Sequence, residues 1–129
     1  MKNENPVVWF EIYTDDLTRA RKFYESIFDF TMTELPLPDN GENMKMLFFP
    51  GNMESKNRAT GALVQMEGFK AGNNSTIVYF MSEDCSLEQL RIEKAGGCIV
   101  KSKMSLGEYG NMVLATDTEG NMIGIHSMK

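Results

Sequence analysis

The chain has 129 residues, of which 42% are hydrophobic and 24% are charged, and its formal net charge is −5. This length and apolar content are typical of one soluble domain with a sizeable core. An acidic chain whose basic residues are scattered repels phosphate backbones, so we expect no nucleic-acid partner. No stretch approaches the roughly 18 apolar residues of a membrane helix, and the N-terminus lacks a signal-peptide pattern, so we expect a cytoplasmic protein with no membrane partner.

Cysteine and methionine usage gives two further expectations. Cys85 and Cys98 form neither a CxxC pair nor a disulfide framework, which favours reduced thiols. Eleven methionines are a high count, and methionine fills irregular spaces in cores. Loose core packing or compositional drift is therefore preferred here over a methionine-lined binding site.

The first half of the chain predicts a strand, a helix and three more strands. Residues 8–13 are rich in aromatic and β-branched side chains, and their period of two separates Val8, Phe10 and Ile12 from Trp9, Glu11 and Tyr13. Asp15 and Asp16 are N-cap candidates for an amphipathic helix over 17–28. Strands are then expected over 30–34, 44–49 and 60–66, with loops at 36–41 and 52–58.

The second half predicts the same order of elements. A strand over 76–81 precedes a helix that begins at Asp84 or Ser86, where Ser86 and Gln89 have capping-box spacing. The buried side of this helix is expected to carry Leu87, Leu90 and Ala95. Strands over 98–103, 111–116 and 122–127 follow, with turns at 106–110 and 117–120.

An internal repeat of about 60 residues indicates a duplicated supersecondary unit. The predicted class is α+β, with two tandem βαβββ modules that form a curved, cup-like mixed sheet and helices on its outside. We expect a single domain over 1–129, with module 1 at about 7–67, a linker at 68–75 and module 2 at about 76–129.

The repeated order resembles the vicinal oxygen chelate superfamily, which includes glyoxalase I, bleomycin resistance proteins and extradiol dioxygenases. The resemblance covers essentially the whole chain, is greatest to the glyoxalase-like branch, and implies a fold rather than a reaction. In the turn over 117–121, Thr118 stands where the family usually has proline. The matching residues are Val8 to Ile12, Asp15 to Leu17, Ala20, Phe23 to Glu25, Ala95 to Gly97 and Asp117 to Asn121.

The resemblance implies that metal-dependent members hold their ion with His, Gln or Glu side chains on the first and last strands of each module. The corresponding positions here are Trp9, Ile77 and Gly124, and a fourth lies in 60–66, where Gln65 is the only candidate. Trp, Ile and Gly offer a metal no side-chain donor, so we predict no metal and no cofactor.

The single histidine gives a displaced alternative for a metal site. His126 lies two residues beyond Gly124, and Glu11 has the same offset from Trp9, but Tyr79 at the matching offset is a poor ligand. Because two ligands hold a transition metal weakly, a histidine at the rim of the cavity is the preferred interpretation.

The predicted cavity face is aromatic and apolar with a few polar groups, as in a small-molecule site. Glu11 is a candidate general base or anchor for a cationic ligand, although a paired or solvated carboxylate is an equal alternative, and a filled core would leave no cavity. The predicted ligand-binding residues are Trp9, Glu11, Tyr13, Ile77, Tyr79, Met81, Met122, Gly124 and His126.

Three functions remain open at this stage. The preferred one is a glyoxalase/bleomycin resistance-like protein that binds a small organic ligand in the sheet cavity without metal. The alternatives are a lyase, isomerase or dioxygenase-type enzyme with displaced metal ligands or a Glu11 base, most simply a glyoxalase-like lyase, and a structural or partner-binding module. Each module ends in sheet edges that must be covered, so we predict a homodimer, in which the modules pair either within one chain or between chains.

Overall fold

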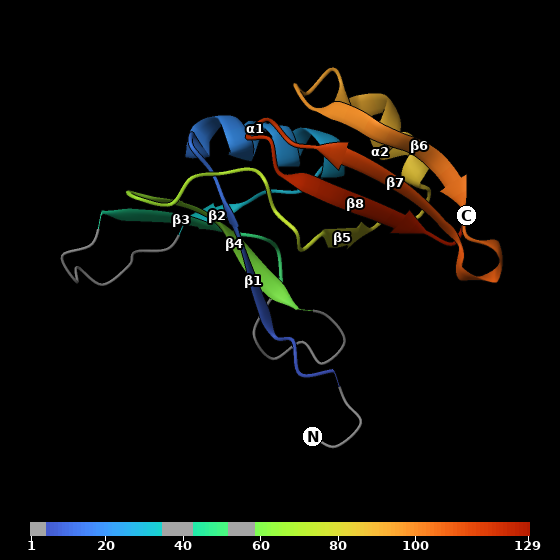
Figure 1. Cartoon of the computed structure of the whole chain (residues 1–129), viewed down its shortest axis with the longest axis horizontal. Coiled ribbons are helices and arrows are strands. Elements are labelled where there is room, and N and C mark those ends of the chain that lie inside the picture. The colour runs from blue at the N-terminus through green and yellow to red at the C-terminus, as the bar shows by residue number, and fades with distance from the viewer. Residues whose placement is uncertain (1–4, 35–42, 52–58) are drawn as a thin grey trace.

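The computed structural model describes residues 5–34, 43–51 and 59–129, and the predicted loops at 36–41 and 52–58 lie outside them. Two helices and two four-stranded mixed sheets confirm the α+β class with two tandem βαβββ modules. Figure 1 shows the order β1 (Trp9–Tyr13), α1 (Leu17–Phe28), β2 (Thr33–Glu34), β3 (Met44–Phe48), β4 (Thr60–Met66), β5 (Val78–Met81), α2 (Cys85–Ile92), β6 (Cys98–Ser105), a short 3-10 helix (Gly107–Tyr109), β7 (Asn111–Thr116) and β8 (Met122–Ser127).

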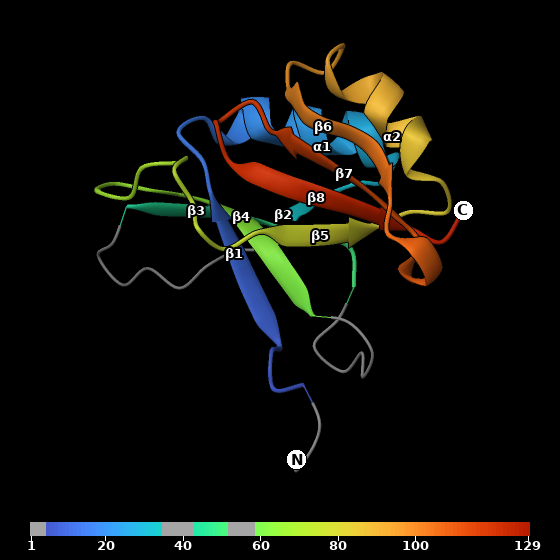
Figure 2. The same cartoon turned by 45° about the vertical axis from the view of Figure 1, so that its right-hand side comes forward.

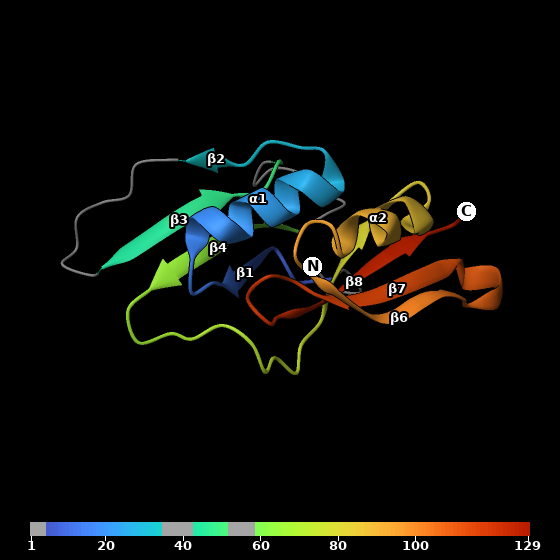
Figure 3. The same cartoon turned by 90° about the horizontal axis from the view of Figure 1, so that it is seen from above.

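Both sheets have the same topology. The strand order is β1-β4-β3-β2 in sheet 1 and β5-β8-β7-β6 in sheet 2, and the first strand of each module pairs in parallel with the last. In Figure 2, β1 and β4 lie side by side and extend below sheet 2. In Figure 3, seen from above, α1 lies in front of β3 and β4, and α2 packs on β6, β7 and β8, so each sheet has one helix-covered face and one open face that points away from the helices.

The first helix forms where the sequence predicts it. Asp16 is its extended N-cap, and the carboxylate accepts a hydrogen bond of 3.1 Å from the amide of Arg19. The chain leaves the helix at Asp29, whose left-handed φ of 54° ends the helical pattern. The buried stripe consists of Ala20, Phe23, Tyr24 and Ile27.

The second helix corrects two predictions. Asp84 is its N-cap and accepts from the amide of Ser86 at 3.0 Å, whereas the Gln89 side chain accepts from the amide of Lys103, so there is no Ser86–Gln89 capping box. Leu87 and Leu90 are 46% and 72% exposed. Because this short helix turns Cys85, Glu88 and Ile92 toward the protein, the two leucines point away from it, and Ala95 lies beyond its end, half-buried against the core.

One hydrophobic core joins the two modules beneath the helices. Phe80 of sheet 2 contacts Tyr24 and Phe28 of α1 and Phe49 of module 1, with ring centroids 5.8, 4.7 and 5.6 Å apart. Phe10 and Ile12 of β1 face this core as predicted, whereas Val8 precedes the strand and is 62% exposed. Within the described part of the chain, no helix is long and apolar enough to cross a membrane.

The turn over 117–121 fastens module 2 to the start of α1. The Glu119 carboxylate accepts from the amides of Asp15 and Asp16 at 2.9 and 2.8 Å, and pairs with Arg19 at 2.7 Å. Burial acts to raise the pKa of Glu119, but hydrogen bonds from Arg19, the two amides and Thr118 outweigh it and lower that pKa. Asn121 donates to the carbonyl of Tyr13 at 2.8 Å, which fixes the end of β1.

Candidate functional site

A carboxylate lies between two aromatic side chains on the open face of sheet 1. Indole Nε1 of Trp9 donates to Oε2 of Glu11 at 3.2 Å, and the hydroxyl of Tyr13 donates to Oε1 at 2.7 Å. The alternation along β1 places these three predicted site residues on the face opposite Phe10 and Ile12. The hydrogen bond to Glu11, then burial, then the carboxylate charge raise the pKa of Tyr13 to about 12.

Glu11 remains accessible to a ligand. Its side chain is exposed rather than enclosed, and each oxygen accepts one of the two bonds while keeping a second acceptor position. The flanking rings are themselves supported, since Trp9 packs edge-on against Phe48 at 5.8 Å and Tyr13 stacks on Phe69 at 5.2 Å. The arrangement therefore presents a fixed negative charge between two rigid aromatic groups.

The strand register places Tyr79, Met81, Gly124 and His126, four of the predicted residues of sheet 2, on its open face. The Tyr79 ring covers Gly124, where an added Cβ would lie 2.4 Å from a ring carbon. His126 Nε2 lies 2.6 Å from the carbonyl oxygen of Tyr109. Met81 is 62% exposed at the end of β5, and Ile77 precedes that strand, half-buried.

A pocket of about 250 Å³ between β1, β5 and β8 brings three predicted residues together. Glu11 and Tyr13 line it from module 1 and Met122 lines it from module 2, whereas the other six predicted site residues do not line it. The sequence did not indicate that Lys70, Gly72 and Asn74 of the 68–75 segment complete this pocket.

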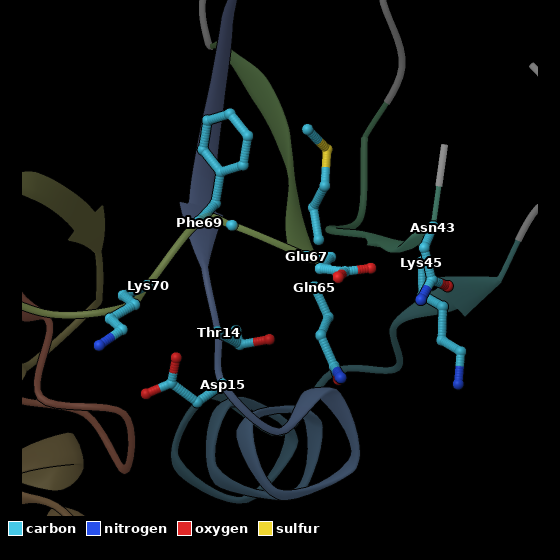
Figure 4. A pocket seen from close by; sticks show the side chains of 10 residues that line it. Thr14, Asp15, Asn43, Lys45, Gln65, Glu67, Phe69 and Lys70 are labelled. Carbon is cyan, nitrogen blue, oxygen red and sulfur yellow. The ribbon is translucent and has the colours of Figure 1, made fainter. Parts of the chain in front are cut away.

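A larger pocket, of about 460 Å³, lies beside the start of α1 (Figure 4), and the sequence did not predict it. Its lining includes Thr14, Asp15, Gln65, Phe69 and Lys70. Lys70 lines both pockets, and the stacked Tyr13 and Phe69 rings contribute one to each, so the two pockets are neighbours. The Gly and Asn residues of the segment suggested only a linker, which is why these contacts were not predicted.

The family's metal positions do not fit a metal ion here. The register of β1 with β4 and β3 places Ala62 and Val64 on the open face and turns Gln65 toward the helix side, where Oε1 accepts from the amide of Leu17 at 2.9 Å. Trp9 and Gly124 offer no donor, and in residues 5–34, 43–51 and 59–129 no three His, Cys, Asp or Glu side chains gather as a metal site. The predicted absence of a metal remains a prediction that metal analysis can test.

Methionines gather on the open faces, contrary to the expectation of a methionine-packed core. Of the described methionines only Met32 belongs to the core cluster. The strand registers place three on the open face of sheet 1 and four on that of sheet 2, namely Met44, Met46 and Met66, and Met81, Met104, Met112 and Met122. The sequence contained one indication of this placement, because the methionines alternate along each strand with residues that face the helices.

Comparison with known proteins gives matches to one superfamily. Residues 7–43 match a family model described as bleomycin resistance protein-like N-terminal. Over 122 residues the chain is 25% identical to CFP32 of Mycobacterium tuberculosis, provisionally named a glyoxylase, and the match covers 91% of this chain and 43% of CFP32. The chain thus spans less than half the length of the curated relatives it matches.

Solved structures agree on the fold. Leishmania major glyoxalase I superposes with a TM-score of 0.70 at 18% identity, over 97% of this chain and 88% of that chain. The V278E mutant of Zea mays glyoxalase I superposes with a TM-score of 0.72 at 18% identity, over 95% of this chain and 46% of that chain. With the tandem βαβββ order, these matches show that the chain has the fold of the glyoxalase/bleomycin resistance/dioxygenase proteins and is similar to that superfamily in sequence.

Proposed function

We propose that this protein binds a small organic molecule on its open sheet face beside Glu11, without a metal ion. The observation that carries the proposal is the exposed Glu11 carboxylate, which is held between Trp9 and Tyr13 and lines a pocket between the modules. A fixed carboxylate next to apolar and aromatic surface is the usual composition of a small-molecule site. The methionines on the same faces add a polarisable surface that adapts to ligand shape.

The charge and rings favour a cationic ligand with an apolar body. An ammonium or amidinium group would take the acceptor positions that Trp9 and Tyr13 leave open on Glu11, while the rings offer cation–π contacts. The net charge of −5 favours the approach of cations from solution. A drug-binding role of the bleomycin resistance type belongs to this class.

A thermal-shift screen of cationic, aromatic and thiol-conjugate compounds tests the proposal. A bound compound at about 100 times its Kd should add roughly 2.7 kcal/mol to the free energy of unfolding. The single tryptophan, Trp9, gives a second readout, because a ligand at Glu11 should change its fluorescence.

Glu11→Gln should weaken binding of any cationic hit by about tenfold or more, since it removes the charge but keeps the shape. Glu108→Gln, at an exposed site on the 3-10 helix, is the matched control and should bind as the wild type does. An unchanged affinity in Glu11→Gln would refute the role of this carboxylate, and a screen without hits would refute small-molecule binding.

Metal analysis separates this proposal from a metal-dependent lyase, isomerase or dioxygenase. Protein purified without added metal should contain Zn, Ni and Fe well below one ion per chain, because the family's positions offer no donors. One equivalent of any of these metals would favour the enzyme and contradict the metal-free site.

We also propose that the chain forms a homodimer. CFP32 and the maize enzyme are about twice the length of the region they share with this chain, which covers 43% and 46% of them. Two copies of this chain would supply a comparable number of modules. Light scattering at micromolar concentration should give about twice the 14.6 kDa chain mass, and a monomeric mass would contradict the dimer.

A further inference from the structure

Three soft donor residues lie in one row across the open face of sheet 2. The register pairs Met112 of β7 with His126 of β8, and His126 with Met81 of β5. Met104 of β6 pairs with Met112 and continues the row. Paired residues share a face, and their Cβ atoms lie about 5 Å apart, so Met112 and Met81 are the cross-strand neighbours of His126 on its two sides.

One ring nitrogen of His126 contacts a backbone carbonyl. His126 Nε2 lies 2.6 Å from the carbonyl oxygen of Tyr109, and because a carbonyl only accepts, Nε2 must carry the proton. The neutral ring then keeps its lone pair on Nδ1. A ring nitrogen that donates to a backbone carbonyl while the other binds a metal is the common arrangement around metal-bound histidines.

From this juxtaposition we propose that His126, Met112 and Met81 bind one soft monovalent cation, of the class of Cu(I) and Ag(I). The two thioethers select such soft ions, and imidazole, which also binds Zn and Fe, completes the set without discriminating between the metals. The site differs from the superfamily's metal positions, since Gly124 and Trp9 do not take part. It is also separate from Glu11, so it stands or fails independently of the small-molecule proposal.

Silver titration followed by NMR of ¹³C-methyl methionine tests the site on the full chain. Silver nitrate in chloride-free buffer is the probe, and Cys98→Ser is the background because the exposed Cys98 thiol would compete for silver. One equivalent should shift the Met81 and Met112 methyl signals well beyond those of Met32, in the core, and Met44, on sheet 1. Met128 is not a control, because its sulfur and His126 Nε2 both lie beside Gly110.

Two substitutions complete the test. Met112→Leu keeps apolar volume and should weaken silver binding at least tenfold, whereas the matched Met44→Leu should leave it unchanged. An unaltered Met32 signal shows that each variant is folded. Equal silver affinity in Met112→Leu, equal shifts at Met44, no binding of silver, or displacement of silver by equimolar Zn(II) would each overturn the site.

Discussion

Two tyrosine–carboxylate pairs of the same chemistry lie on opposite sides of the sheets. On the helix-covered side, the buried Tyr24 hydroxyl donates to Asp117 at 2.6 Å. On the open side, Tyr13 donates to the exposed Glu11 at 2.7 Å. Burial first, and then the Asp117 charge and hydrogen bond, raise the pKa of Tyr24 well above its usual value, whereas the hydrogen bond to Glu11 is the main cause at Tyr13.

The difference separates the part of the molecule that holds the fold from the part that we propose binds a ligand. Asp117 is also engaged by the amides of Glu119 and Asn121, at 2.8 and 2.9 Å, so its pair is part of the link between the modules. Among the described residues, Glu11 accepts only from Trp9 and Tyr13 of its own strand, β1. Substitutions on the covered side should therefore change stability, and those on the open side should change ligand binding.

The largest expected effect is that of Glu119→Ala, which removes the buried carboxylate from the link. The amides of Asp15 and Asp16 lose their acceptor, so the free energy of unfolding should fall by about 2–4 kcal/mol. Urea denaturation measures the loss, and Glu108→Ala, an exposed carboxylate, should change stability by less than about 0.5 kcal/mol.

The same variant has a predicted pH signature. The pKa of Glu119 is lower in the folded protein than the usual value of about 4.3, so its contribution is present above that value and is lost as pH falls through the folded pKa. Between neutral pH and pH 3 the wild type should therefore lose more stability than Glu119→Ala. Parallel pH profiles for the two proteins would contradict the ionised link.

Tyr24→Phe is expected to lower the free energy of unfolding by less than Glu119→Ala does. The ring contacts with Phe23, Phe49 and Phe80 remain, but Asp117 loses the hydroxyl and keeps the weaker bond from Asn121 at 3.2 Å. Unpairing a buried acceptor in this way should cost about 1–3 kcal/mol in urea denaturation. A neutral substitution would mean that the Asn121 side chain alone satisfies Oδ2 of Asp117.

Much of the fold was predictable because local patterns and the repeat agree. The bounds of α1, β4, β7 and β8 match the predicted ranges, since periodicity, caps and turns all indicate the same elements there. The face of α2 was wrong because an eight-residue helix carries too few periodic positions to fix its rotation. Its buried stripe includes Glu88, a residue that hydropathy assigns to the surface.

The site was less predictable than the fold. Alternation along β1 correctly placed Trp9, Glu11 and Tyr13 on one face, but the sequence could not show that they bond to one another. The pocket contacts of Lys70 and Phe69 arise from a segment without regular periodicity. The methionine row depends on the pairing of strands distant in the chain, which a single sequence does not contain.

The smallest stability effect is expected at Tyr13→Phe, on the open side. Its hydroxyl bonds to a solvated carboxylate, so the substitution should change the free energy of unfolding at neutral pH by less than about 0.5 kcal/mol. The contribution of the Tyr13–Glu11 hydrogen bond to stability should instead be measurable at high pH. Because the folded pKa of Tyr13 is about 12, above the usual value of about 10, its contribution is complete below pH 10 and is lost as pH rises toward 12.

Ultraviolet titration of phenolate formation measures this difference directly. Glu11→Gln removes the carboxylate charge and replaces the ionised acceptor, so the Tyr13 ionisation should move from about 12 back toward 10. Tyr24 should not follow it, because its pKa depends on burial and Asp117. If Glu11→Gln leaves the tyrosine titration unchanged, the hydrogen bond between Tyr13 and Glu11 does not form in solution. Glu11 would then not be held in place, and the proposed ligand site would lose the fixed carboxylate on which it depends.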